Sequence, residues 1–410
     1  MMSKTNRLTL WILIAMVIGI IAGYAMHTGM EEGARKEVAD NLKILTDIFL
    51  RLVKMIIAPL VFSTLVVGIA KLGDMKTVGR VGGRALLWFM SASLVSLLLG
   101  MVLVNFLKPG VGLNLEATGD VADVIGKTHS FTLKDFIAHL FPKSVVEAMA
   151  TNEVLQIVVF SIFFGVACAS IGEYAMPVVK LLESVSHVIL KMVGYVMNFA
   201  PLGVFGAIAA VIAIHGLGVL STYAVYIGQF YIGLAILWII LLGAGFLFLG
   251  HRMKELMRRI LQPITIAFST TSSEAVMPKL MEELERFGCK DRVVSFVLPL
   301  GYSFNLDGSM MYMTFASLFI AQVYGIDMDF GTQMTMLLTL MLTSKGIAGV
   351  PRASLVVVAA TLGMFGVPVE GIALILPIDH FCDMGRSATN VVGNAIATSV
   401  VSKWEGDLGK

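Results

Sequence analysis

The first part of the chain, up to Gly250, consists of long apolar runs separated by short polar connectors. An apolar run of about 20 residues can cross a bilayer as an α-helix, so the pattern predicts membrane-spanning helices. The predicted spans are Leu8–Met26, Leu42–Leu72, Ala85–Leu107, a broken stretch around Ser130–Ile171, Met176–Ile214 and Thr222–Leu249. Several exceed the length of a straight span, and we expect these to tilt or to extend beyond the bilayer. The polar stretch Pro109–Thr128 is the predicted main extramembrane loop.

Beyond Gly250 the apolar segments are interrupted by polar or helix-breaking residues. Leu261–Leu280 contains a run of hydroxyl residues at 270–273, and Met334–Val367 contains two glycines and a proline within Gly346–Pro351. Non-helical backbone at membrane depth survives only inside protein or beside water, which predicts two re-entrant hairpins that each enter and leave on one side. Paired interruptions of this kind point to a transporter's binding site. The remaining spans are Phe296–Tyr324 and Ile372–Lys403, which makes eight predicted crossings.

The distribution of basic residues predicts the orientation, because lysine and arginine collect on the cytoplasmic side of a membrane. They cluster at Lys4/Arg7, Lys71–Arg84, Arg252–Arg259, Lys279–Arg292 and Lys403, whereas the connector Tyr324–Thr332 is acidic. Eight crossings then place both termini in the cytoplasm of a multi-pass protein of the inner (plasma) membrane. No convincing cleavage site follows Leu8–Met26, so this run is interpreted as the first span and not as a signal peptide.

Composition narrows the functional class. Hydrophobic residues make up 57% of the 410 and charged residues only 14%, compared with about 25% charged residues in soluble proteins. A net charge of +2 and the lack of a basic arm argue against a nucleic-acid partner. No nucleophile–base pair or metal-ligand cluster is visible, so neither an enzyme nor a cofactor is predicted. An ion channel is the alternative from a different class, because polar pores also place acids in membranes.

Four polar residues in the last apolar segment, Asp379, Asp383, Arg386 and Asn390, are spaced by four, three and four positions. Residues at these spacings share one face of a helix, and an ionisable group at membrane depth needs a partner or water. Arg386 is the most specific of them, because its planar fork matches a carboxylate. It indicates either an anion-binding site or an internal salt bridge to Asp379, Asp383 or Glu274, and both interpretations stay open.

Three other stretches each have a functional and a structural interpretation. The hydroxyl run at 270–273 is interpreted as a hairpin tip whose backbone N–H groups face an anion, in preference to ordinary hydrogen bonding between helices. Asn305–Ser309 offers a carboxylate, an amide and freed carbonyls, which suit a hard cation or a fixed polar network; its structural alternative is a glycine kink with one solvated acid. Gly346–Pro351 is either a mobile gate over the ligand or a static kink.

Together, the two hairpins, the Asn305–Ser309 signature and the last polar helix resemble the dicarboxylate/amino acid:cation symporter family, the glutamate transporter family. The resemblance covers the whole chain and is greatest to bacterial proton-coupled glutamate/aspartate symporters. It implies an all-α membrane protein with eight transmembrane helices, two re-entrant helical hairpins, a scaffold and an elevator-type transport domain, assembled as a homotrimer. The implied division is 1–84 (scaffold helices 1 and 2), 85–128 (transport-domain helix 3 and outer loop), 129–218 (scaffold helices 4 and 5) and 219–410 (remaining transport domain).

The resemblance also assigns a substrate site. Arg386 would bind the side-chain carboxylate of the substrate, Asp383 its ammonium group, and Asn390 its α-carboxylate. The complete implied set is Ser272, Ser273, Gly349, Val350, Asp383, Arg386, Ser387 and Asn390. Related carriers of C4-dicarboxylates tend to lack an acid at the position of Asp383, so the resemblance favours acidic amino acids.

The implied ion-coupling residues are Gly301, Ser303, Asn305, Asp307, Ser344 and Asn394. Sodium-coupled members have a carboxylate where this chain has Asn394, and a neutral amide should bind sodium poorly. A second family sodium site uses hydroxyls on the third helix, where this chain has Phe89 and Ala92 but retains Ser93. These differences predict proton coupling. A third site, around Ser303 and Ser344, is preserved and keeps residual sodium binding open.

The sequence does not identify the residue that carries the proton. In animal members a glutamate that carries the proton follows the signature glycine, and here Tyr312 and Met313 stand in that region. Asp307, Asp383, Glu274 and His380 are the candidates.

The sequence thus predicts a secondary active transporter that imports L-glutamate and L-aspartate with protons by an elevator mechanism. A sodium-coupled glutamate/aspartate symporter and a C4-dicarboxylate symporter of the same fold are the alternatives. The expected partners are a small acidic substrate, the lipid bilayer and further copies of the chain.

Overall fold

The computed structural model describes residues 4–72, 75–111, 141–216, 223–344 and 353–409. Within these ranges the backbone is almost entirely helical. The helices of the first half are α1 (Lys4–Gly29), α2 (Glu32–Leu72), α3 (Met75–Leu107), α6 (Val145–Ala150), α7 (Val154–Ile171), the short η1 (Gly172–Ala175), α8 (Met176–Met197), α9 (Ala200–His215) and α11 (Ala224–Leu249). Those of the second half are α12 (Arg252–Thr270), η2 (Glu274–Val276), α13 (Met277–Phe287), α14 (Asp291–Phe304), α15 (Asp307–Val323), α16 (Phe330–Thr343), α17 (Ala353–Met364), η4 (Val369–Leu374) and α18 (Leu376–Trp404).

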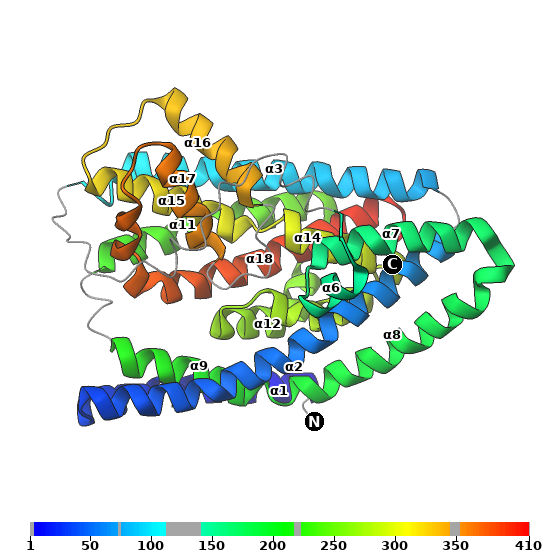
Figure 1. The fold of residues 1–410 in the computed structure, drawn as a ribbon, viewed down its shortest axis with the longest axis horizontal. Coiled ribbons are helices and arrows are strands. Elements are labelled where there is room, and N and C mark those ends of the chain that lie inside the picture. The colour runs from blue at the N-terminus through cyan, green and yellow to red at the C-terminus, as the bar shows by residue number, and fades with distance from the viewer. Residues whose placement is uncertain (1–3, 73–74, 112–140, 217–222, 345–352, 410) are drawn as a thin grey trace.

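The helices α1, α2, α7, α8 and α9 pack on one another, with α1, α2 and α9 side by side along the lower edge of Figure 1. The approach of α1 to α9 depends on Gly23, where a Cβ would lie 2.7 Å from the carbonyl oxygen of Ala209. The expectation of one helix over Met176–Ile214 is wrong, because α8 ends at Met197 and α9 begins at Ala200. Pro201 explains the break, since a proline cannot bond to the carbonyl four residues earlier.

The helix α18 is the centre of the second half. It packs against α3, α11, α12, α14 and α15, and every residue from Met384 to Ser402 is buried. A helix that is buried on all sides needs small or apolar residues all round, and the sequence of α18 supplies them. Its buried hydroxyls Thr389, Thr398 and Ser399 donate to carbonyls one turn earlier on α18. Its charged and amide side chains need partners from their surroundings.

Five helical stretches of the described chain are long and apolar enough to cross a membrane: Leu10–Gly29, Glu32–Ala70, Lys76–Leu107, Val154–Met197 and Ala224–Leu249. Large apolar side chains lie exposed on them, with 62% of Trp11 and 83% of Leu247 accessible. Such surfaces suit lipid and not water. The predicted spans Leu8–Met26, Leu42–Leu72 and Ala85–Leu107, and the described part of Thr222–Leu249, are helical as expected. The count of eight crossings and the division into scaffold and transport domains stay predictions. Most of the predicted loop Pro109–Thr128 lies outside the described residues.

Two of the predicted interruptions are confirmed. The helices α12 and α13 pack against each other across a turn at the hydroxyl run, where Thr271 has a left-handed φ of 54°. The segment Phe296–Tyr324 is broken between Phe304 and Asp307, where α14 ends and α15 begins. The third interruption, at Gly346–Pro351 between α16 and α17, lies outside the described residues.

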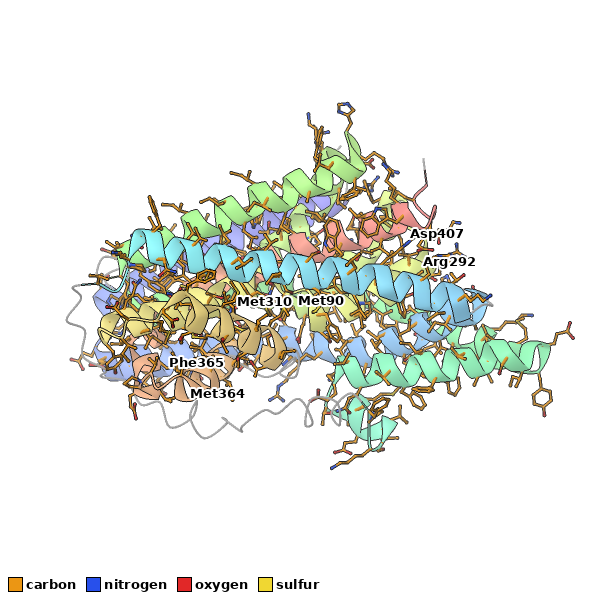
Figure 2. All side chains as sticks on the ribbon, turned by 90° about the horizontal axis from the view of Figure 1, so that it is seen from above. Met90, Arg292, Met310, Met364, Phe365 and Asp407 are labelled. Atoms are coloured by element: carbon orange, nitrogen blue, oxygen red, sulfur yellow. The ribbon has the colours of Figure 1, made fainter. Side chains whose placement is uncertain are left out.

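Glu405 and Asp407, which follow α18, form ion pairs with residues of α3 and at the start of α14. Figure 2 shows Arg292 and Asp407 side by side at one end of the molecule. Asp407 lies 2.5 Å from Arg292 and 2.7 Å from Lys290 at the start of α14. Glu405 lies 2.7 Å from Arg84 of α3. Burial by itself raises the pKa of Asp407, but the two basic partners outweigh it and hold this pKa below its ordinary value.

Candidate functional site

The polar face predicted for the last helix is present on α18. The helix is continuous from Leu376 to Trp404, so Asp379, Asp383, Arg386 and Asn390 do lie on one side of it. Asp379, Arg386 and Asn390 are each less than 5% exposed. Buried charged and amide groups at this density require hydrogen-bond partners, and the partners identify what each group does.

Arg386 is held on two sides. Its Nε donates to Oδ1 of Asp383 at 2.6 Å, and its guanidinium carbon lies 4.7 Å from the ring centre of Tyr312. Ser387 donates to the same Asp383 oxygen at 3.1 Å. The internal salt bridge that the spacing left open is therefore present, and it is made with Asp383. Nη1 of Arg386 nevertheless has no hydrogen-bond partner within the described part of the chain, so the guanidinium keeps an edge for a ligand.

Tyr312 of α15 connects Arg386 to Asp379. Its ring faces the guanidinium, and its hydroxyl donates to Oδ1 of Asp379 at 2.6 Å. Tyr312 is fully buried, so the hydrogen bond fixes the ring that covers Arg386. Sequence reasoning gave Tyr312 no role and considered Asp379 only as a partner for Arg386. The sequence offered one signal for a role of Tyr312. It lies one helical turn after Gly308 of the signature, so the two residues share a face of their helix.

Asn390 joins α18 to the beginning of α15. Its Oδ1 accepts hydrogen bonds from the backbone N–H groups of Gly308 at 2.9 Å and Ser309 at 3.3 Å. Its Nδ2 donates to the hydroxyl of Ser309 at 3.1 Å. The two helices meet closely here, since a Cβ at Gly308 would collide with the backbone of Arg386. Asn390 thus satisfies the first N–H groups of α15, which have no partner inside that helix.

The predicted ion-coupling residues gather one turn further along α18. Nδ2 of Asn305 lies 3.3 Å from both Oδ2 of Asp307 and Oδ1 of Asn394. Ser96 of α3, which sequence reasoning did not identify, donates to Asp307 at 3.5 Å. Gly301 and Gly393 permit this cluster, because a Cβ at either position would strike an oxygen of Asn394 or Asp307. Asn305, Asp307 and Asn394 are almost fully buried.

The donor set of this cluster fits a hard cation only in part. Oδ1 of Asn305, Oγ of Ser303 and Nδ2 of Asn394 have no hydrogen-bond partner among the described residues. Two of these atoms are oxygens that could bind a cation, but the third is an N–H donor that would repel one. Within the described ranges no three His, Cys, Asp or Glu residues come together as a metal site.

The remaining predicted residues lie in other surroundings. Ser344 donates to the carbonyl of Met341 at 3.0 Å, and no hydrogen bond between described residues joins it to Ser303. Ser272 accepts a hydrogen bond from the backbone of Ala275 at 3.2 Å, which shapes the turn between α12 and α13. Ser273 is buried beside it. Gly349 and Val350 lie outside the described residues, so their predicted part in the site stays a prediction.

Comparison with known proteins agrees with this architecture. A family model described as the Sodium:dicarboxylate symporter family matches residues 8–404. The C4-dicarboxylate transport protein of Laribacter hongkongensis is 42% identical over 402 residues, which cover 97% of this chain and 89% of that protein. Proteins of the same name are 43% identical in Agrobacterium fabrum, over 97% of this chain and 88% of that protein, and 40% identical in Bacillus subtilis, over 99% and 96%.

Proposed function

The chain belongs to the sodium:dicarboxylate symporter family, whose members are integral membrane proteins, and we propose that it transports small C4-dicarboxylate anions together with protons. The named relatives support the dicarboxylate alternative better than the glutamate and aspartate expected from Asp383. The transporter class, which performs no covalent chemistry, follows from the family.

The observation that carries this proposal is the buried guanidinium of Arg386. A buried N–H group without a partner costs roughly 1–3 kcal/mol, and Nη1 of Arg386 is such a group among the described residues. A substrate carboxylate would satisfy it with a charge-assisted hydrogen bond. Asp383 and the Tyr312 ring already fix the direction of the fork, so a carboxylate would meet a preorganised cation.

Asp383 can act in this site by orienting Arg386, even when the substrate has no ammonium group. One of its oxygens already accepts from both Arg386 and Ser387, so the carboxylate serves to orient the guanidinium. Aspartate is the second candidate substrate, because 18% of the Asp383 side chain is exposed and could meet an ammonium group. The second carboxylate of either substrate is proposed to lie near Asn390 and the two hairpin tips, at Ser272, Ser273, Gly349 and Val350.

The charges of the site support coupling to a cation. Asp383 pairs with Arg386, and Asp379 accepts from Tyr312, whose ring covers the same arginine. A bound dianion therefore adds negative charge to a site that holds no excess of positive charge. Uncompensated charge in a buried site costs several kcal/mol, and cations must therefore enter with the substrate. Asn394 disfavours sodium at the neighbouring cluster, so we assign the coupling to protons.

Asp379 is the group we propose as a proton carrier, which the sequence did not suggest. It is 3% exposed and accepts a hydrogen bond from the hydroxyl of Tyr312, whose ring lies against Arg386. Protonation of Asp379 would reduce the negative charge beside the arginine just when an anion arrives. The elevator movement and the trimer belong to the same proposal and rest on the family resemblance. The cytoplasmic termini also belong to it and rest on the distribution of basic residues along the chain.

Uptake into proteoliposomes of the purified protein tests this function. Radiolabelled succinate and aspartate would be offered with an inward proton gradient in sodium-free buffer, and then with a sodium gradient at equal pH. Accumulation of succinate with the proton gradient alone, reduced by fumarate and malate, is the expected result. Accumulation of aspartate without succinate would overturn the substrate, and accumulation only with sodium would overturn the coupling.

A further inference from the structure

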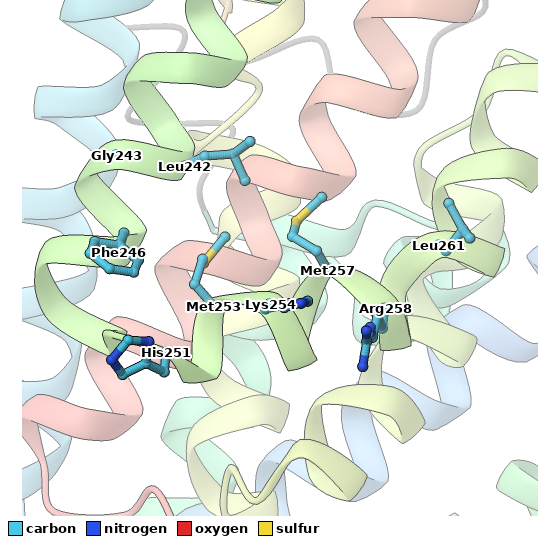
Figure 3. Close-up of a pocket in the computed structure, with 9 residues that line it drawn as sticks. All are labelled: Leu242, Gly243, Phe246, His251, Met253, Lys254, Met257, Arg258 and Leu261. Atoms are coloured by element: carbon cyan, nitrogen blue, oxygen red, sulfur yellow. The ribbon is translucent and has the colours of Figure 1, made fainter.

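A groove lies between α11 and the beginning of α12, and the residues that line it include none of α18 (Figure 3). Its volume is about 850 Å³. The lining consists of residues from both helices and the connection between them: Leu242, Gly243, Phe246, His251, Met253, Lys254, Met257, Arg258 and Leu261. Apolar side chains form the walls, and three basic side chains accompany them.

The walls of the groove are suited to a hydrocarbon chain. Phe246 of α11 and Leu261 of α12 are 53% and 56% exposed, and Leu242 and Met257 lie between them in Figure 3. Because α11 is one of the helices long and apolar enough to cross a membrane, this side of the protein faces the acyl chains of a bilayer. A single lipid chain would cover apolar surface that the described protein leaves open.

Among the described residues, the basic side chains of the groove have no acidic partner. Lys254 and Arg258 are exposed and stand one turn apart on α12, and no ion pair joins either of them to an acid in the described ranges. The neighbouring Arg259 differs, because it is paired with Glu255 at 2.8 Å. Lys254 and Arg258 thus present two uncompensated positive charges beside the apolar walls, and His251 lies next to them against Phe246.

We propose that this groove binds an anionic phospholipid of the cytoplasmic leaflet. The phosphate would lie among His251, Lys254 and Arg258, and an acyl chain would lie along the apolar walls. The basic segment Arg252–Arg259 is predicted to be cytoplasmic, and that leaflet attracts basic side chains through its anionic lipids. A soluble phosphate would leave the walls uncovered, whereas an uncharged lipid would leave the two charges unpaired.

The location gives the lipid a route to influence transport. The helix α12 begins at this groove and ends at Thr270, directly before the hairpin tip at Ser272 and Ser273. A lipid that holds the beginning of α12 therefore stabilises the helix that carries the tip. This inference does not depend on the substrate or on the coupling ion.

Native mass spectrometry of the full-length protein tests the proposal, with dioleoyl-phosphatidylglycerol and dioleoyl-phosphatidylcholine as probes. The double variant Lys254→Gln/Arg258→Gln should lose about 25-fold in affinity for phosphatidylglycerol, at roughly fivefold for each basic side chain. The matched control Arg259→Gln removes one charge from the same helix, outside the groove. It should bind within about twofold of the unchanged protein.

Three results would overturn the proposal. Equal binding of the two lipids, or unchanged phosphatidylglycerol binding by the double variant, would exclude an anionic headgroup site. Displacement of the lipid by millimolar inorganic phosphate would identify a site for free phosphate instead. Since both substituted side chains are exposed, the variants should fold, and thermal unfolding of each purified variant checks this.

Discussion

The replacement Asp383→Ser separates the two candidate substrates. Asp383 lies 2.6 Å from Arg386, and its carboxylate accepts from Ser387 as well. Serine removes the negative charge but keeps an oxygen that can accept from the guanidinium. The site then loses the repulsion between Asp383 and an incoming dianion, and it also loses the only partner we assign to a substrate ammonium.

The magnitude follows from the electrostatics of the site. Two carboxylates on one guanidinium, about 6 Å apart, repel by about 3 kcal/mol at an effective dielectric constant of about 20. The Asp383 side chain is 18% exposed, so solvent screening reduces this to about 1–2 kcal/mol. Succinate affinity should therefore rise roughly 5- to 30-fold, while aspartate affinity falls.

The assay measures the KM of succinate and aspartate uptake in proteoliposomes for the variant and for the unchanged protein. Ser387→Ala is the matched control. It removes the hydroxyl that donates to the same Asp383 oxygen, and it leaves the negative charge of Asp383 in place. Its substrate preference should stay within about threefold, since one neutral hydrogen bond contributes roughly 1 kcal/mol or less. An unchanged ratio of aspartate to succinate uptake in Asp383→Ser would refute the role of Asp383 in choosing the substrate.

Three further predictions concern other charged residues. Arg386→Ala should weaken substrate binding about 30-fold or more, because a buried charged hydrogen-bond partner contributes about 2–5 kcal/mol; saturable uptake with unchanged KM would contradict this. Asp379→Asn should retain succinate exchange but lose proton-driven accumulation, and accumulation in that variant would exclude Asp379 as the proton carrier. Asp407→Asn should lower the free energy of unfolding by about 1–2 kcal/mol at pH 7, since Arg292 and Lys290 lose their acid. The pKa of Asp407 is lower in the folded protein, so its stabilising effect is present above the unfolded pKa of about 3.9 and is lost as pH falls through the folded pKa. Thermal unfolding should therefore show the variant to be less stable than the unchanged protein at pH 7. In strongly acidic buffer the two proteins should unfold at the same temperature.

The helices and their interruptions could be predicted because their causes are local. An apolar run such as Leu8–Met26 is long enough to span, and a run of four hydroxyl residues disfavours a continued helix at the α12–α13 turn. The break at Asn305 follows from the same kind of local chemistry. The division between α8 and α9 also has a local cause, Pro201, but the unbroken apolar pattern of Met176–Ile214 concealed it.

The site was predicted only where its residues share one helix. Spacing along the chain determines that Asp379, Asp383, Arg386 and Asn390 lie on one face of α18, because the helical repeat is fixed. Spacing does not determine which groups from other helices meet that face. Tyr312 comes from α15, as does Ser309, and Ser96 comes from α3.

The sequence by itself therefore determined a helical membrane protein of a transporter family with a buried arginine on its last helix. Tertiary packing decided which groups surround that arginine. The close approach of α15 at Gly308 places the Tyr312 ring over the guanidinium, and the Tyr312 hydroxyl donates to Asp379. Within the described ranges, packing also leaves Lys254 and Arg258 without an acidic partner, whereas Arg259 is paired with Glu255. Helix periodicity is a property of a short segment, whereas the pairing of buried charges depends on which helices fill the space around them.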